Sequence, residues 1–582
     1  MALMRLFLGA VVAICATITA TQATTVVSWI QLGPGSSPAA LASGSYGDQP
    51  ASLTPTILAR ALITSRSGGC PSVTLENGTA LTMNPRFDAT QSVGGVGLSG
   101  GLHAVGTSPN TTTAFVTATT QGTLSNGDQQ ATTDWTVCEA VVPPGHTTAT
   151  IDGTQLKLPI AHPQRILVIA DTGCRLTSSA TTTASGGFNQ QDCHNPNFFP
   201  FNYLSTYEAQ FAPDLVIQVG DYFYRDAPCA PGVNNYNVAQ NTATEASGAV
   251  ACNDPTNASY DPWGDTFDAW NGDLFFPAAQ LLQTAPWIMV RGNHESCGRG
   301  ARGWFALLDP HPYNLNQVNC PKNAGNATVT GTTPLYTGDF TPSYAVPAGQ
   351  ISFIVHDSSF ANDSSVDTNM AKNYDLDLTA LLSGLHAAGS NGPFVYATHK
   401  PTYGLTSVNS GGYDASGNPN SGDFTEQFTF SGNATANSAF HNGVVPPSIA
   451  FFLSGHIHEF EYVNFTNNAN FAPQLIVGTG GDNLDYTANP TVSSLPSAPP
   501  PTAQLTYQYA TGTPKPIDLH ASATTATVSQ TTVTNEYSQA EFGFAVLDAT
   551  ATGYVANVYT LGNNRAGRCV ITLSPRSIQC WK

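Results

Sequence analysis

The sequence is poor in charged residues, and above all in basic ones. Of 582 residues, 19 are Lys or Arg and 38 are Asp or Glu, so 10% are charged and the formal net charge is −19 at pH 7. Lys and Arg form no cluster along the chain, so the positive surface that nucleic-acid binding requires is missing. An anionic ligand would have to be held by something other than lysine.

No apolar run reaches the roughly 18 residues that a membrane-spanning helix needs. The run from Leu6 to Ile18 follows Arg5 and precedes small residues at Ala20 and Ala23, a pattern typical of a secretory signal peptide. We therefore predict a signal peptide over residues 1–23 and a mature protein that is secreted, extracellular and without a membrane anchor.

The sequence also lacks a Cys-x-x-Cys pair, which would suggest zinc or redox chemistry. Of eleven cysteines, Cys15 lies in the predicted signal peptide, and the even number that remains suits disulfides in an oxidising compartment. We predict pairing between neighbours along the chain: Cys70 with Cys138, Cys174 with Cys193, Cys229 with Cys252, Cys297 with Cys320, and Cys569 with Cys580. Sequons mark predicted surface loops for glycans at Asn77, Asn110, Asn257, Asn326, Asn362, Asn433 and Asn464.

Two regions differ in their hydrophobic pattern. From residue 24 to 160, short alternating runs separated by Gly, Pro and Asn predict an all-β sandwich domain. From 161 to 582, continuous apolar runs alternate with helical stretches such as Asp375–Leu385, which predicts an α/β layered domain. A Pro-, Thr- and Ser-rich stretch at about 489–535 is predicted to be a low-complexity insertion.

The α/β region contains seven apolar runs that are typical of strands buried on both faces. In such a domain, ligands collect outside the carboxyl ends of the strands. The predicted strands are Arg165 to Ala170, Leu215 to Val219, Trp287 to Val290, Ile351 to Val355, Phe394 to Ala397, Ile449 to Leu453, and Gln474 to Val477.

The first of these strands ends in Asp171-Thr172-Gly173. This motif also occurs in aspartic proteases, which need a second Asp-Thr/Ser-Gly because two carboxylates share one proton. The chain has no second copy, so this alternative is disfavoured. Four further strand ends carry carboxylate, phenol, amide and imidazole groups, and together these predict a metal site: Gly220-Asp221-Tyr222-Phe223-Tyr224, Gly292-Asn293-His294-Glu295, Ala397-Thr398-His399, and Gly455-His456-Ile457-His458.

In these motifs the sequence resembles the calcineurin-like metallophosphoesterases, and within them the purple acid phosphatases of secreted microbial type. The resemblance covers about 165–559. It implies two mixed β-sheets flanked by helices, preceded by a fibronectin-like sandwich, and an enzyme that is a metal-dependent phosphoric ester hydrolase.

The resemblance also implies two metal ions. Asp221 would bridge both, because a carboxylate has two oxygens. Asp171, Tyr224 and His458 would complete the first site, and Asn293, His399 and His456 the second. The hard phenolate of Tyr224 favours Fe(III) in the first site, whereas an amide and two imidazoles suit divalent Zn, Mn or Fe in the second.

The predicted function is a secreted, acid phosphatase-like enzyme that hydrolyses small phosphomonoesters by attack of a metal-activated hydroxide. His294 is the predicted acid that protonates the leaving alkoxide, or else it only orients a ligand. A phosphodiesterase or nucleotidase could use the same metal centre. A third hypothesis is a non-catalytic extracellular binding protein, which the complete ligand set disfavours.

The sequence departs from plant purple acid phosphatases near the substrate. Residues 401–408 contain no histidine where those enzymes carry one, and Glu459-Phe460-Glu461-Tyr462 replaces Ala-Tyr-Glu-Arg. His441 could substitute or lie on the surface, and His356-Asp357 could contact the ligands. Arg225 could contact phosphate or pair with Asp226.

Overall fold

The computed structural model describes residues 25–37, 47–63, 69–86, 92–93, 96–97, 136–176, 191–225 except 192, 195 and 197–198, 235–237, 242–244, 261–313 except 266 and 297–298, 329–361 except 336–339, 368–405, 424–426, 445–465, 472–484 except 483, 516–517, 531–539, and 542–581 except 562–563. The predicted signal peptide, His441 and most of the stretch 489–535 lie outside these residues. Within that stretch, 516–517 and 531–535 are strand.

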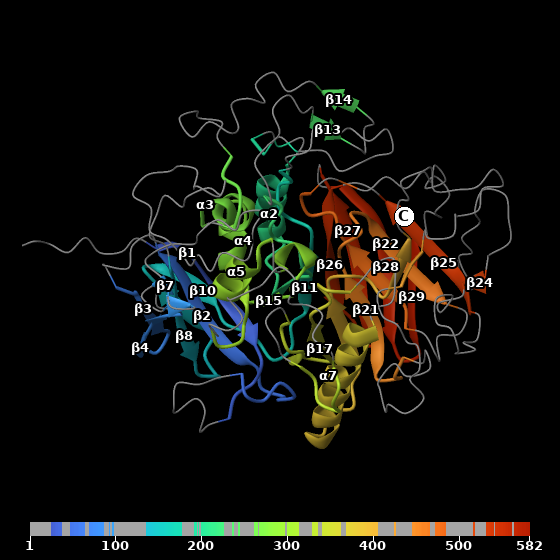
Figure 1. Cartoon of the computed structure of the whole chain (residues 1–582), viewed down its shortest axis with the longest axis horizontal. Coiled ribbons are helices and arrows are strands. Elements are labelled where there is room, and N and C mark those ends of the chain that lie inside the picture. The colour runs from blue at the N-terminus through green and yellow to red at the C-terminus, as the bar shows by residue number, and fades with distance from the viewer. Residues whose placement is uncertain are drawn as a thin grey trace, which may run out of the picture.

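One sheet runs through both predicted domains (Figure 1). It has eleven strands, in the order β29 (Arg576–Trp581), β28 (Asn564–Leu573), β27 (Gly553–Thr560), β26 (Gly543–Ala549), β11 (Arg165–Ile169), β12 (Leu215–Gln218), β15 (Trp287–Met289), β1 (Thr25–Gly33), β2 (Thr56–Ile63), β8 (Thr136–Val142) and β5 (Asn84–Pro85).

A second sheet packs against the first. Its eight strands follow the order β16 (Tyr344–Ala348), β17 (Ile351–His356), β18 (Phe394–Thr398), β21 (Ile449–Ser454), β23 (Gln474–Val477), β22 (Phe460–Phe465), β25 (Thr531–Gln539) and β24 (Pro516–Ile517). Val168, Phe353 and Leu453 belong to one buried core cluster between the sheets. All seven strands predicted for the α/β region are present.

Helices cover the outer faces of the two sheets (Figure 1). On the first sheet, α2 (Phe201–Gln210), α4 (Ala279–Thr284), α3 (Phe267–Trp270) and two π-helices, η4 (Asn271–Phe275) and η6 (Trp304–Leu308), form a second core cluster. On the second sheet, α7 (Thr368–Ala387) buries Leu378, Leu381 and Leu385. This helix contains the predicted stretch Asp375–Leu385 and extends it at both ends. The predicted arrangement of two mixed sheets flanked by helices is confirmed.

The predicted N-terminal sandwich is present, but one of its sheets is not its own. A four-stranded sheet of β10 (Thr154–Lys157), β9 (Thr148–Ile151), β3 (Ser72–Leu75) and β4 (Ala80–Thr82) shares a core with β1, β2 and β8. Yet Gln31 of β1 also pairs in parallel with Trp287 of β15. Strand pairing therefore joins residues on both sides of the predicted domain boundary at residue 160. The boundary itself stays a prediction.

Three predicted disulfides are confirmed: Cys70–Cys138, Cys174–Cys193 and Cys569–Cys580. The last joins directly paired residues of the terminal hairpin β28–β29. The pairs Cys229–Cys252 and Cys297–Cys320 lie outside the described residues.

Two of the seven sequons lie in the described part of the chain. Asn77 is exposed in the turn between β3 and β4, as predicted. Asn464 is not in a surface loop: it lies in β22 with 7% exposure, so that interpretation was wrong. Glu461 and Tyr462 of the same strand are buried too, and a sequon permits glycosylation without fixing the local structure.

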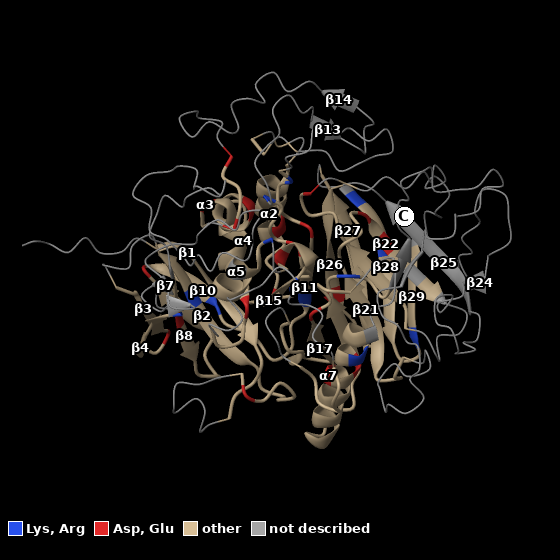
Figure 2. Cartoon of the chain, in the orientation of Figure 1, with Lys and Arg blue, Asp and Glu red and all other residues tan. Residues whose placement is uncertain are grey.

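Lys and Arg are not confined to one element in the described part of the chain. Figure 2 shows Lys and Arg spread over several elements, from β2 to β28. No helix in the described ranges is long and apolar enough to cross a bilayer.

Candidate metal centre

The seven predicted ligands come from the carboxyl ends of five strands. Asp171 follows β11, Asp221 and Tyr224 follow β12, and Asn293 follows β15, all in the first sheet. His399 follows β18, and His456 and His458 follow β21, in the second sheet. Because the two sheets pack face to face, their strand ends bring these side chains to one place.

The first predicted set gathers around the phenol oxygen of Tyr224. Its Oη lies 2.7 Å from Asp171 Oδ1, 3.0 Å from Asp221 Oδ2 and 3.0 Å from His458 Nε2. Tyr224 is fully buried. The other three residues assigned to the first site therefore all contact Tyr224.

The second predicted set surrounds the Nε2 of His399. This atom lies 3.0 Å from Asn293 Oδ1 and 3.1 Å from Asp221 Oδ2. Asp221, His399 and His456 each place one potential ligand atom within 4.8 Å of the others. Asp221 thus belongs to both sets through Oδ2, as expected for a bridging carboxylate.

Three of these residues have left-handed backbone, with φ of 56° at Asp171, 55° at Asp221 and 71° at His456. Non-glycine residues adopt this conformation rarely, mostly Asp, Asn and His, and hold it where the surroundings enforce it. A Cβ at Gly220 would lie 2.4 Å from His399 Nδ1, and one at Gly292 would lie 2.1 Å from Asp221 Oδ1. Glycine is therefore needed at both motif positions for close approach.

Hydrogen bonds fix which imidazole nitrogen faces the centre. His399 Nδ1 donates to the carbonyl of Val219 at 2.8 Å, which leaves Nε2 as the ligand atom. His458 Nδ1 lies 3.4 Å from Asp482 Oδ2, and its Nε2 faces Tyr224. Such partners on the second nitrogen are typical of metal-binding histidines.

Asp482 belongs to a buried group that sequence reasoning missed. It forms an ion pair with Arg175, whose Nε lies 3.0 Å from Oδ2. The Cζ atom of Arg175 lies 4.7 Å from the centroid of the Tyr224 ring. One ion pair therefore touches two of the four first-site ligands. Asp482 follows two glycines in a segment with no recognisable motif, so no sequence signal identified it.

Two other buried carboxylates hold the ligand loops. Glu295 accepts backbone N–H bonds from Gly292, Asp221, Tyr222 and Phe223 at 2.8–3.1 Å. Burial, and then the charge of Asp221, raise the pKa of Glu295 to about 8.

Asp273 of η4 accepts N–H bonds from Cys174 at 3.1 Å and from Tyr224 at 2.8 Å. Burial raises the pKa of Asp273 to about 6, against the opposing effect of Arg225. The two carboxylates thus set the loops that carry Asp171, Asp221, Tyr224 and Asn293.

Arg225 forms ion pairs rather than facing the centre. Its Nε donates to Asp273 at 2.6 Å and its Nη1 to Asp261 at 3.1 Å. This favours the pairing alternative, with partners other than Asp226, which lies outside the described residues.

His356 and Asp357 stand apart from the ligands. His356 Nδ1 lies 2.7 Å from Ser343 Oγ, and Asp357 accepts from Arg291 Nη1 at 3.0 Å. Arg291 Nη2 in turn donates to the carbonyl of Glu295 at 2.8 Å. Asp357 therefore supports the Asn293 loop through Arg291.

His294 lies at the edge of both sets. Its backbone N–H donates to Asp221 Oδ1 at 2.8 Å. Its ring packs on Tyr224 with centroids 4.0 Å apart, and the residue is 6% exposed. A ring in this position can donate a proton to a ligand bound at either set, or it can orient Tyr224.

The donor set fits a hard cation. Burial, then the charges of Asp171 and Asp221, raise the pKa of Tyr224 well above its usual value, so the phenol keeps its proton until a cation takes its place. A phenolate and two carboxylates are hard anionic ligands. The amide and imidazoles of the second set suit a divalent ion.

A model of the family described as calcineurin-like phosphoesterase matches residues 164–460, which is 297 of the 582 residues. No match was found among curated proteins.

Similar solved structures include a purple acid phosphatase from yellow lupin (Lupinus luteus) seeds, with a TM-score of 0.40 and 12% identity over 92% of this chain and 72% of that one. PhoD has a TM-score of 0.42 and 9% identity over 95% and 91%. A dimetal phosphatase from Danio rerio has 0.32 and 11% over 71% and 99%. Because the family model matches more than half of the chain, this protein belongs to the calcineurin-like phosphoesterases and is a metal-dependent phosphoric ester hydrolase.

Proposed function

We propose that this protein is a secreted, purple acid phosphatase-like enzyme that hydrolyses phosphomonoesters, with Fe(III) at the Tyr224 set and a divalent Zn, Mn or Fe ion at the His399 set. The observation that carries the proposal is the position of Tyr224 Oη among Asp171, Asp221 and His458. A phenolate favours a trivalent ion over a softer divalent one. Three disulfides support an oxidising compartment.

Two bound ions would supply an activated water and neutralise charge on the phosphoryl oxygens. The protein's own residues do the positioning. Asp221 is anchored by the His294 N–H and sits between the two sets. His399 and His458 present Nε2 because their Nδ1 atoms face Val219 and Asp482. His294 lies beside Asp221 and Tyr224, and a proton on its ring would pass to the oxygen of the leaving alkoxide.

An assay with metal analysis tests the proposal. The purified protein is compared on 4-nitrophenyl phosphate and bis(4-nitrophenyl) phosphate, and its metals are counted. We expect two metal ions per chain, at least one of them iron, and a higher kcat/KM for the monoester. A higher value for the diester would favour a phosphodiesterase, and a preparation with one metal that is fully active would contradict the dinuclear mechanism.

His294→Asn separates an acid from an orienting residue. If His294 protonates the leaving oxygen, kcat should fall by about 10²–10⁴-fold for an alkyl phosphate. It should fall much less for 4-nitrophenyl phosphate, because nitrophenolate leaves without a proton. Equal losses on both esters, with an unchanged pH profile, would show that the ring only orients its neighbours.

Asp482→Asn tests whether the ion pair of Asp482 and Arg175 positions the first-site ligands. Removing this charge takes away the partner of His458 Nδ1 and of Arg175, so affinity for the first-site ion should fall by about 10–100-fold. The measurement is the loss of each metal to a chelator over time. We expect faster loss of the first-site ion alone. Equal release of both metals, or no change, would contradict a positioning role.

A further inference from the structure

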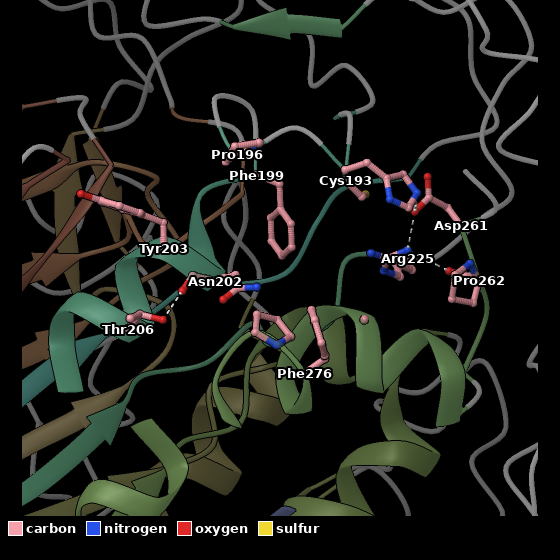
Figure 3. A pocket seen from close by; sticks show the side chains of 13 residues that line it. Cys193, Pro196, Phe199, Asn202, Tyr203, Thr206, Arg225, Asp261, Pro262 and Phe276 are labelled. Carbon is pink, nitrogen blue, oxygen red and sulfur yellow. Dashed lines mark hydrogen bonds and ion pairs between the residues drawn. The ribbon is translucent and has the colours of Figure 1, made fainter. Parts of the chain in front are cut away.

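A pocket of about 620 Å³ is lined by Arg225, at the end of the segment that follows β12 (Figure 3). It opens between α2, η4 and the segment around His194. None of the seven predicted ligands lines it. Its volume is in the range of small-molecule sites in proteins.

Aromatic side chains form the apolar part of the pocket. Phe276 and Tyr203 are 66% and 52% exposed, and they are the two aromatic residues among the large apolar side chains exposed in the described chain. Both line this pocket, together with Phe199. Figure 3 shows Phe199 and Phe276 on opposite sides of the space. Two exposed aromatic residues on the lining of one hollow indicate a binding site rather than scattered surface residues.

The other end of the pocket is polar and built from buried groups. The Arg225 side chain is 4% exposed and is held by Asp273 through Nε and by Asp261 through Nη1. Its Nη2 has no hydrogen-bond partner among the described residues. A Cβ at Gly272 would lie 3.1 Å from the Arg225 Cζ, so this glycine keeps one face of the guanidinium open. The pocket therefore offers a fixed donor beside a flat cationic surface.

Charge decides which ligand fits. Two carboxylates, Asp261 and Asp273, face one guanidinium, and His194 lies 3.2 Å from Asp261. Even with a protonated His194 the polar end is not net positive, so it does not favour an anion. A planar ring can stack on Phe276 and on the Arg225 face. A hydrogen-bond acceptor on the ring can accept a hydrogen bond from the Nη2 N–H.

We propose that this pocket is a binding site for an uncharged planar aromatic molecule that carries a hydrogen-bond acceptor, separate from the metal centre. Such a ligand would lie close to the metal centre, because Arg225 directly follows Tyr224 in the chain and both residues donate hydrogen bonds to Asp273. Cys193 in its wall is bonded to Cys174, three residues after Asp171. The inference does not depend on the reaction proposed above.

Binding of small probes to the metal-loaded protein tests the proposal by saturation-transfer NMR titration. Benzamide has a planar ring and an uncharged acceptor, cyclohexanecarboxamide has the same acceptor without planarity, and benzoate adds a negative charge. We expect saturable binding of benzamide and weaker binding of the other two. Phe276→Ala should weaken benzamide binding about threefold to tenfold, the equivalent of one aromatic contact.

Ile160→Ala is the matched control, because Ile160 is 50% exposed and lies outside the pocket. It should leave binding unchanged. Phe276 is even more exposed, so its truncation should not affect folding, and Tyr203→Ala provides a second lining variant. The proposal is overturned if benzamide does not bind, if cyclohexanecarboxamide or benzoate binds equally well, or if both lining variants bind like the wild type.

Discussion

Asp221→Asn should lower kcat/KM by at least about 10³-fold, or about 4 kcal/mol of transition-state stabilisation. Asp221 Oδ2 lies 3.0 Å from Tyr224 Oη and 3.1 Å from His399 Nε2, so one atom serves both ligand sets. Burial opposes its charge, but His399 and His294 hold the pKa of Asp221 well below its usual range. An amide at this position cannot bridge two cations as an anion, so metal content should fall as well.

A matched control exists elsewhere in the chain. Asp152, in the turn between β9 and β10, also has left-handed backbone, with φ of 45°, and is exposed. Asn tolerates this conformation about as well as Asp does, so Asp152→Asn should preserve folding and activity. Kinetics and metal analysis of both variants check the prediction. Full activity in Asp221→Asn would contradict the bridging role, and an inactive wild type would favour the non-catalytic binding protein.

The sequence predicted the ligand-bearing strands well because their signal is local. A run such as Leu215–Gln218 is apolar throughout, which indicates a strand buried on both faces. Parallel strands then deliver whatever follows them to one edge. Asp221 and His399 could therefore be placed together although they are 178 residues apart in the chain.

Contacts between residues far apart in the chain could not be predicted where no sequence motif marks them. β1 is buried over its last seven residues, and nothing in its sequence specifies that it pairs with β15. Asp273 lies 48 residues beyond Arg225, in a π-helix that no sequence pattern predicts. Asp482 is a lone carboxylate after two glycines. Each of these acts through a long-range contact, for which single-residue patterns carry no signal.

Tyr224→Phe is expected to remove a visible absorption band and most of the bound iron. A phenolate bound to Fe(III) absorbs visible light by charge transfer from ligand to metal, so the proposed enzyme should be coloured. Phe lacks the oxygen that lies within 3.0 Å of Asp171, Asp221 and His458, and the first site would lose its hardest anionic ligand. The ring is retained, so its packing on His294 should persist and the fold should survive.

Tyr222→Phe is the control, because its hydroxyl is also fully buried but donates to the carbonyl of Gln218 at 3.2 Å. Losing that bond should lower the free energy of unfolding by about 1 kcal/mol and leave colour, iron and activity unchanged. Absorption spectra, metal content and thermal unfolding of both variants make the comparison. If the wild type is colourless, fully active with zinc or manganese alone, and indifferent to Tyr224→Phe, the iron assignment is wrong. The phosphoesterase function would still hold, because the ligands of the second set, Asn293, His399 and His456, do not depend on Tyr224.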